Sequence, residues 1–148
     1  MDTAKTSTQA WECVLSSVAA ILCIVACVWA GQAYDPISPL TAAYLIEVAS
    51  ISIACGAFIW FSGDGDSSFL MLAAWTTGGM LVGITIMGML SIGALLIPSD
   101  VMLISAATMA AGRKKMRMFL NLGVCSLAAI AQAGLMLLAI RLAVGGQY

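Results

Sequence analysis

Apolar stretches alternate with short polar segments along the chain, and the length of each stretch predicts a membrane-spanning helix. The stretches are clearest at residues 13–33, 40–61 and 118–144, which are separated by turns rich in Pro, Gly, Asp and Ser. A hydrocarbon core of roughly 30 Å is crossed by about 20 helical residues. Each of these three stretches is therefore long enough to cross a bilayer.

The segment from residue 69 to residue 112 has to be divided before its crossings can be counted. It holds 44 residues and a single charged residue, Asp100. One helix of this length would run roughly 66 Å, about twice the hydrocarbon core. The run from Gly88 to Gly93 contains two glycines and a serine and predicts a turn, which gives spans at 69–87 and 94–111. A break at Pro98-Ser99-Asp100, which is typical of a helix start, is the alternative and gives four spans.

The predicted fold is therefore an all-α, polytopic transmembrane helix bundle with five spans, or four in the alternative. Hydrophobic residues make up 62% of the chain and charged residues only 9%, whereas a soluble domain has about 25% charged residues. We expect residues 1–148 to form one transmembrane domain in contact with the lipid bilayer. The first nine residues are mixed in character and are predicted to be a tail or an interfacial turn. The net charge of −1 gives no reason to expect nucleic acid as a partner.

A basic cluster carries the topological signal. Four of the six positive charges fall in one short loop, at Arg113, Lys114, Lys115 and Arg117. Lys and Arg are retained on the cytoplasmic side of membrane proteins, so this loop is predicted to be cytoplasmic and could also bind anionic lipid headgroups. The C-terminus is then outside in either topology. The N-terminus is cytoplasmic with five spans and outside with four.

No catalytic or cofactor-binding chemistry is indicated. The chain has no histidine, which removes the commonest general base and the usual ligand of haem, copper and zinc. The five cysteines lie in or beside apolar runs without metal-type spacing, so they are interpreted as packing residues. We expect no bound metal, no cofactor and no enzymatic activity.

Four polar residues are predicted to share one layer of the bundle. Glu47 and Asp100 are acidic residues inside spans, and such residues raise a functional hypothesis. Both lie roughly 9–12 Å below the outer surface when counted along their helices. Thr85 and Gln132 fall at the same depth. The carboxyl groups could share a proton or hold a cation. The alternative is structural, with Glu47 protonated and hydrogen-bonded within the bundle and Asp100 capping a helix.

The third span carries small residues at the spacing that lets membrane helices approach closely, namely Gly79, Gly83 and Gly88. We interpret them as helix-packing positions, within the bundle or against a partner. The leading functional hypothesis is a non-catalytic structural or accessory subunit of a larger membrane complex. The alternative is a small oligomeric transporter of protons, cations or small solutes that uses the intramembrane carboxylates. The expected protein partners are accordingly other subunits or further copies of this chain.

Overall fold

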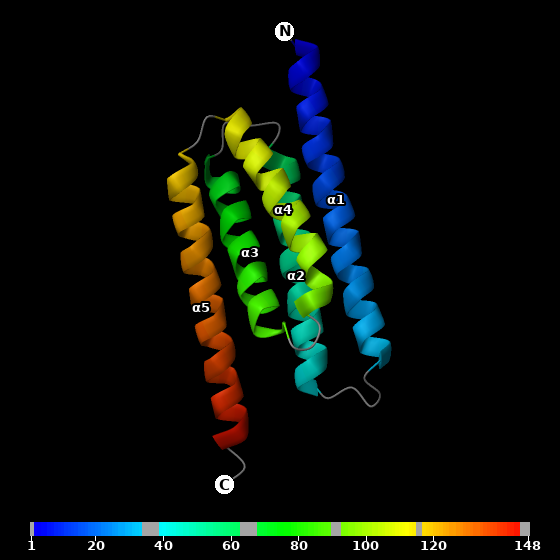
Figure 1. The fold of residues 1–148 in the computed structure, drawn as a ribbon, viewed down its shortest axis with the longest axis vertical. Coiled ribbons are helices and arrows are strands. Elements are labelled where there is room, and N and C mark those ends of the chain that lie inside the picture. Colours follow the sequence, from blue (N-terminus) through cyan, green and yellow to red (C-terminus); the bar gives the residue numbers. More distant parts are fainter. Residues whose placement is uncertain (1, 34–38, 63–67, 90–92, 115–116, 146–148) are drawn as a thin grey trace.

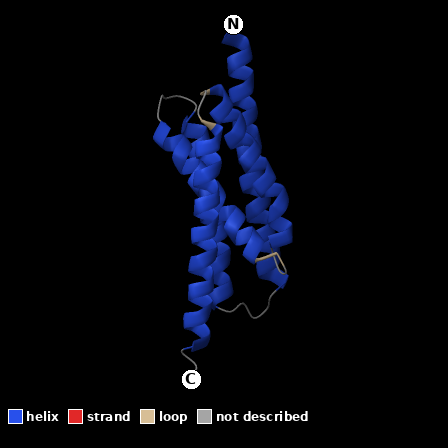
Figure 2. Ribbon diagram, turned by 60° about the vertical axis from the view of Figure 1, so that its left-hand side comes forward, coloured by secondary structure: helices blue, strands red, loops and turns tan. Residues whose placement is uncertain are grey.

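The computed structural model describes residues 2–33, 39–62, 68–89, 93–114 and 117–145, and five α-helices account for nearly all of them. The helices are α1 (Asp2–Ala33), α2 (Pro39–Ser62), α3 (Ser68–Met87), α4 (Gly93–Arg113) and α5 (Met118–Gly145). All five run along one long axis of the molecule, in both Figure 1 and Figure 2. Each is long and apolar enough to cross a membrane. The protein is a five-span, all-α membrane bundle, as its sequence predicts.

Helices α1 to α4 close into a ring, and α5 is attached to its outside. Within the ring, α1 packs against α2 and α4, while α3 packs against α2 and α4. Helix α5 lies along α3 and makes only a small contact with α4, as Figure 1 shows at its left. Half of the most apolar stretch of α3 is buried, against 6% of that of α5. The fifth helix is therefore peripheral, and most of its surface faces outward.

The turn between α3 and α4 confirms the five-span division of residues 69–112. Helix α3 ends at Met87 and α4 begins at Gly93. The Gly93 amide donates a 2.7 Å hydrogen bond to the Gly88 carbonyl and closes the turn. The alternative break at Pro98 is wrong, because α4 continues through this proline. A proline has no backbone N–H and so cannot make the helical hydrogen bond to the carbonyl four residues earlier. For Pro98 that carbonyl belongs to the second residue of α4, so the missing bond falls in the first turns of the helix.

The start of α1 differs from the expected tail. The helix begins at Asp2, eleven residues before the apolar run, and extends beyond the other helices at the end marked N in Figure 1. Residues 2–9 contain no glycine or proline to interrupt a helix. The lack of a helix breaker explains why the helix extends into this polar segment.

Small side chains bring the helices close together. The face of α1 directed into the ring carries Ala19, Cys23, Cys27 and Ala30, and the face of α4 carries four buried alanines. Gly79 and Gly83 of α3 lie against the backbone of α5. A Cβ atom at Gly83 would come within 2.5 Å of the Ala129 carbonyl oxygen. The Gly-x-x-x-Gly pattern therefore lies at the contact that attaches α5 to α3.

Most of the exposed aromatic residues in the described part of the chain gather at one end of the bundle, whereas Trp29 is exposed near the other end. They come from four helices and lie near the end where Arg113 is found: Trp11, Trp60, Phe61, Phe69 and Phe119. Aromatic side chains are enriched where membrane meets water. This end, called the basic end below, therefore has the character of a membrane interface. The first residue of α1 lies at the basic end and the last residue of α5 at the opposite end.

Candidate functional site

The four polar residues expected in one layer form two separate pairs. The first pair joins α2 to α5. The Gln132 amide nitrogen donates a hydrogen bond of 2.8 Å to a carboxyl oxygen of Glu47. Gln132 is 3% exposed, whereas Glu47 lies on the outer surface of the bundle. The nearby Ser50 hydroxyl on α2 does not donate to this carboxyl group, since it donates to the Ile46 carbonyl instead.

The second pair lies inside the ring. Asp100 of α4 is 6% exposed, and Thr85 of α3 lies beside it. Neither the Thr85 hydroxyl nor the Asp100 Oδ1 atom has a hydrogen-bond partner among the described residues. Asp100 does not begin its helix, because α4 starts seven residues earlier. It is therefore a core residue and not a helix cap.

Further polar groups surround Asp100 from the other helices of the ring. Cys23 of α1 lies beside Ser52 of α2 and Ser99 of α4, and it is within electrostatic range of Asp100. The Cys23 thiol also points at the Val48 carbonyl oxygen, at 3.9 Å. We call this group of core side chains from all four helices the polar core; its members are Cys23, Cys27, Tyr44, Ser52, Thr85, Ser99 and Asp100.

Several polar atoms of the polar core are buried and have no hydrogen bond among the described residues. The Ser99 hydroxyl donates to the Ala19 carbonyl of α1 at 2.8 Å. By contrast, the hydroxyl oxygens of Tyr44, Ser52 and Thr85 have no partner within the described part of the chain. An unsatisfied buried polar group costs about 1–3 kcal/mol. The polar core is therefore a place where a small ligand, a proton or water would gain hydrogen bonds that the protein itself does not supply.

Two other buried polar side chains lie nearer the basic end. The Trp75 indole nitrogen and both side-chain polar atoms of Asn121 are buried, again with no partner among the described residues. Among the described residues, no acidic or basic side chain forms a hydrogen bond or ion pair with either of them. They add a donor and an amide to the α3–α5 region but no titratable group.

The basic end holds a buried ion pair that the sequence analysis did not anticipate. Arg113 of α4 donates to both carboxyl oxygens of Glu12 on α1, from Nε at 3.1 Å and from Nη2 at 2.7 Å. The Glu12 side chain is 1% exposed and that of Arg113 10%. Such a two-pronged pair fixes geometry as well as supplying attraction. It joins the first and fourth helices of the ring.

The rest of the basic cluster lies differently. Arg117 is exposed just before α5, and Lys114 follows the last residue of α4 and is partly buried. Lys115 falls outside the described residues. Arg113 is thus paired with Glu12, whereas Arg117 exposes its positive charge at this end. The lipid-headgroup role suggested for the cluster remains a prediction for these residues.

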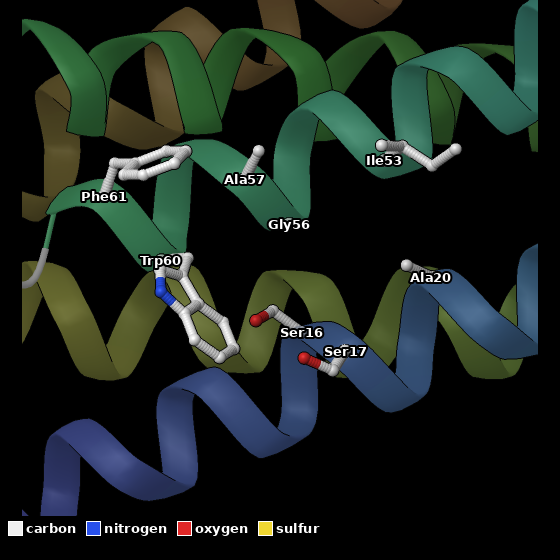
Figure 3. A pocket seen from close by; sticks show the side chains of 8 residues that line it. All are labelled: Ser16, Ser17, Ala20, Ile53, Gly56, Ala57, Trp60 and Phe61. Carbon is white, nitrogen blue, oxygen red and sulfur yellow. The ribbon is translucent and has the colours of Figure 1, made fainter.

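A groove opens between α1 and α2 on the outside of the ring. It has a volume of about 340 Å³. Figure 3 shows small side chains along both helices and the Trp60 ring projecting toward α1. Its lining is almost wholly apolar, and the Ser16 hydroxyl is already bonded to the Cys13 carbonyl. The groove offers a packing surface rather than a chemical site; it is lined by Ser16, Ser17, Ala20, Ile53, Gly56, Ala57, Trp60 and Phe61.

Metal-binding geometry is not found in the described part of the chain. No group of three or more His, Cys, Asp or Glu side chains converges there. All five cysteines are free thiols. Cys55 points at the Ala74 carbonyl oxygen, at 3.5 Å, which fits the packing role expected from the sequence.

Sequence reasoning located Asp100 and Thr85 but missed their neighbours in the polar core. Serine, cysteine and tyrosine are ordinary residues in membrane helices, so their types alone gave no signal. The Glu12–Arg113 pair did have a signal, because the chain crosses the bundle four times between Glu12 near the start of α1 and Arg113 at the end of α4, and an even number of crossings returns it to the same end. Comparisons with protein-family models, curated proteins and solved structures found no match for this chain.

Proposed function

We propose that this protein is a non-catalytic subunit of a larger membrane complex. The observation that supports this is the position of Glu47, a carboxyl group on the outer face of α2 in the membrane-spanning part of the helix. Glu47 lies about 7 Å from the middle of the apolar stretch of α2, counted along the helix. A single bundle in lipid would present this group to hydrocarbon.

The energies favour a covered Glu47. A charged side chain in the middle of a membrane helix costs about 3 kcal/mol on insertion scales. The hydrogen bond from Gln132 offsets only part of this, because interhelical hydrogen bonds in membranes average about 0.6 kcal/mol. A partner that supplied a second donor to the carboxyl group and excluded lipid would remove most of the remaining cost. Helix α5, which Gln132 joins to Glu47, carries exposed apolar side chains that would extend such an interface.

The orientation of the bundle is part of the proposal. The basic end is assigned to the cytoplasm, because Arg113, Lys114 and Arg117 lie there. The N-terminus is then cytoplasmic and the C-terminus outside. In this orientation Glu47 and Asp100 both lie in the outer half of the membrane.

Purification in mild detergent tests the subunit proposal, and site-directed photo-crosslinking sharpens it. A photoreactive residue at Ile46, exposed next to Glu47, should crosslink to a different membrane protein that also copurifies with the chain. The same residue at Val25, exposed on α1, is the matched control. Recovery of this chain alone or only as a homo-oligomer, with crosslinks solely between identical copies, would contradict the subunit proposal.

A small oligomeric transporter of protons, cations or small solutes is the second candidate. It is supported by Asp100, a buried carboxyl group with unpartnered hydroxyl groups around it. The version in which Glu47 and Asp100 share one proton requires the two carboxyl groups to be close neighbours. The position of Glu47 does not support that version, because its carboxyl group lies on the outer surface and is bonded to Gln132. A transporter would therefore act through Asp100. Flux into proteoliposomes that is lost in Asp100→Asn and kept in Glu47→Gln is the expected result for it.

A further inference from the structure

We propose that Asp100 and the hydroxyl groups of the polar core bind a single exchangeable positive charge, either a proton or a sodium ion. The first reason is that Asp100 is buried without a basic partner. The described basic side chains lie at the ends of helices, and Arg113 is paired with Glu12. Along α4, Arg113 is about 20 Å from Asp100. A buried carboxylate must be neutralised or paired, and no cationic side chain among the described residues does so.

The second reason is a contrast among the hydroxyl groups of the bundle. Elsewhere in the spans, Ser and Thr hydroxyls donate to carbonyls of their own helix one turn earlier, at Ser50, Thr76, Thr77, Ser105 and Thr108. This local bond is the usual way for such side chains to be satisfied in a helix. Ser52 and Thr85 are more deeply buried and do not make it. Their oxygens remain available inside the ring.

The available atoms are of one chemical kind. Carboxylate and hydroxyl oxygens are hard ligands, and hard oxygen ligands suit alkali and alkaline-earth cations rather than soft metals. A single carboxylate balances one charge, which favours a monovalent ion or a proton over a divalent ion. The same oxygens could hydrogen-bond to a protonated Asp100. Proton and sodium ion are thus two occupants of one site, and the experiment separates them.

Other titratable groups face this site and enter any pH dependence. From α1 these are the thiols of Cys23 and Cys27, and from α2 the Tyr44 phenol and the Cys55 thiol. No titratable side chain of α3 is placed beside Asp100; its contribution is Thr85. Asp100 is the acidic residue of this group.

The charge would enter from the end opposite the basic cluster. Asp100 lies about 10 Å along α4 from the first residue of the helix. The α3–α4 turn is at that end, and the Tyr44 hydroxyl lies against it, 2.6 Å from the position of a Cβ atom on Gly88. Tyr44, beside the turn, and Thr85, beside Asp100, are thus two described polar side chains in this part of the ring.

Infrared spectroscopy of the full-length protein in liposomes tests the proposal, with Asp100→Asn as the test variant and Glu47→Gln as the control for the other carboxyl group. For a proton, we expect a carboxylic-acid carbonyl band that disappears in Asp100→Asn, persists in Glu47→Gln, shifts in D₂O and titrates with pH. For sodium, we expect a carboxylate band and an unfolding midpoint that rises with NaCl but not with choline chloride. That rise should be absent in Asp100→Asn.

A second variant keeps the test valid if Asp100→Asn does not fold. Ser52→Ala combined with Thr85→Val retains the carboxyl group and removes two hydroxyl groups of the polar core, that of Thr85 beside Asp100 and that of Ser52 beside Cys23. Loss of a hydrogen bond to a charged group is worth about tenfold or more in affinity, so the pH or sodium midpoint should move by at least that factor. Ser105→Ala with Thr108→Val is the matched control and should leave the midpoint unchanged. An acid band that ignores pH and D₂O, or a carboxylate band with no response to sodium, would overturn the proposal.

Discussion

Replacement of Arg113 by alanine should destabilise the bundle far more than removal of any other charge from the same loop. In the native protein the Arg113 guanidinium makes two hydrogen bonds to Glu12, whose side chain is 1% exposed. Arg113→Ala leaves this carboxylate buried at the α1–α4 contact without its partner. The pair lies near the membrane interface, but the low exposure of Glu12 prevents water from replacing the guanidinium.

The expected cost follows from burial. Removing one member of a buried ion pair typically costs 3–5 kcal/mol, because it leaves an uncompensated buried charge. We expect about 3 kcal/mol for Arg113→Ala. Glu12→Gln should cost less, about 1–2 kcal/mol, because Arg113 is more exposed and its long side chain can turn toward water.

The assay is reversible unfolding of the purified protein in mixed micelles by added dodecyl sulfate, followed by circular dichroism and by tryptophan fluorescence. Trp11, next to Glu12, provides a local probe. Arg117→Ala is the matched control: it removes the same charge from the same loop, but Arg117 is exposed, so the change should be within about 0.5 kcal/mol. Equal effects of Arg113→Ala and Arg117→Ala, or no coupling between Glu12→Gln and Arg113→Ala in a double-mutant cycle, would refute the reasoning.

Three other predictions concern α5, the topology and Glu47. Gly83→Leu should detach α5 and lower the unfolding midpoint, because a side chain there meets the Ala129 backbone, whereas Gly134→Leu, with open space around it, should not; equal midpoints for the two variants would contradict the close contact. A single cysteine at Thr8, in a variant without the native cysteines, should resist an impermeant maleimide in intact cells and react after lysis, whereas ready labelling in intact cells would rule out a cytoplasmic N-terminus. Glu47→Gln should leave the unfolding free energy of the isolated bundle nearly unchanged and Glu47→Leu should lower it by about 0.6 kcal/mol, so a large loss in either variant would show that Glu47 does more than accept the Gln132 hydrogen bond.

The number of helices and their boundaries could be predicted because they depend on length and on local backbone preferences. A 44-residue apolar run cannot be one crossing, and the two glycines at 88 and 93 mark where the chain turns. Pro98 was a weaker signal, because a proline near the start of a helix disturbs few hydrogen bonds. The early start of α1 could not be read from hydropathy, since residues 2–9 are polar yet contain nothing that stops a helix.

The grouping of the polar residues, by contrast, could not be predicted, because it depends on how each helix is rotated and not on its length. Depth in the membrane follows from counting residues, and the count placed Glu47 and Asp100 at similar depths. The direction in which a side chain points depends on the rotation of its helix about its own axis. Helix α2 is apolar on all sides, so nothing in its sequence pattern tells which side faces the ring. Only packing against α1 and α3 directs Ser52 inward and Glu47 outward.

The two carboxyl groups therefore differ in what each can bind. Asp100 is buried among the four helices of the ring, where a partner would have to be enclosed with it. Glu47 accepts a hydrogen bond from Gln132 through one oxygen, and a carboxylate has further acceptor sites on its second oxygen. A docking helix with a side-chain donor could thus bind Glu47 without breaking the bond that joins α2 to α5. Since α5 otherwise packs mainly on the glycines of α3, a partner bound there would also hold the fifth helix in place.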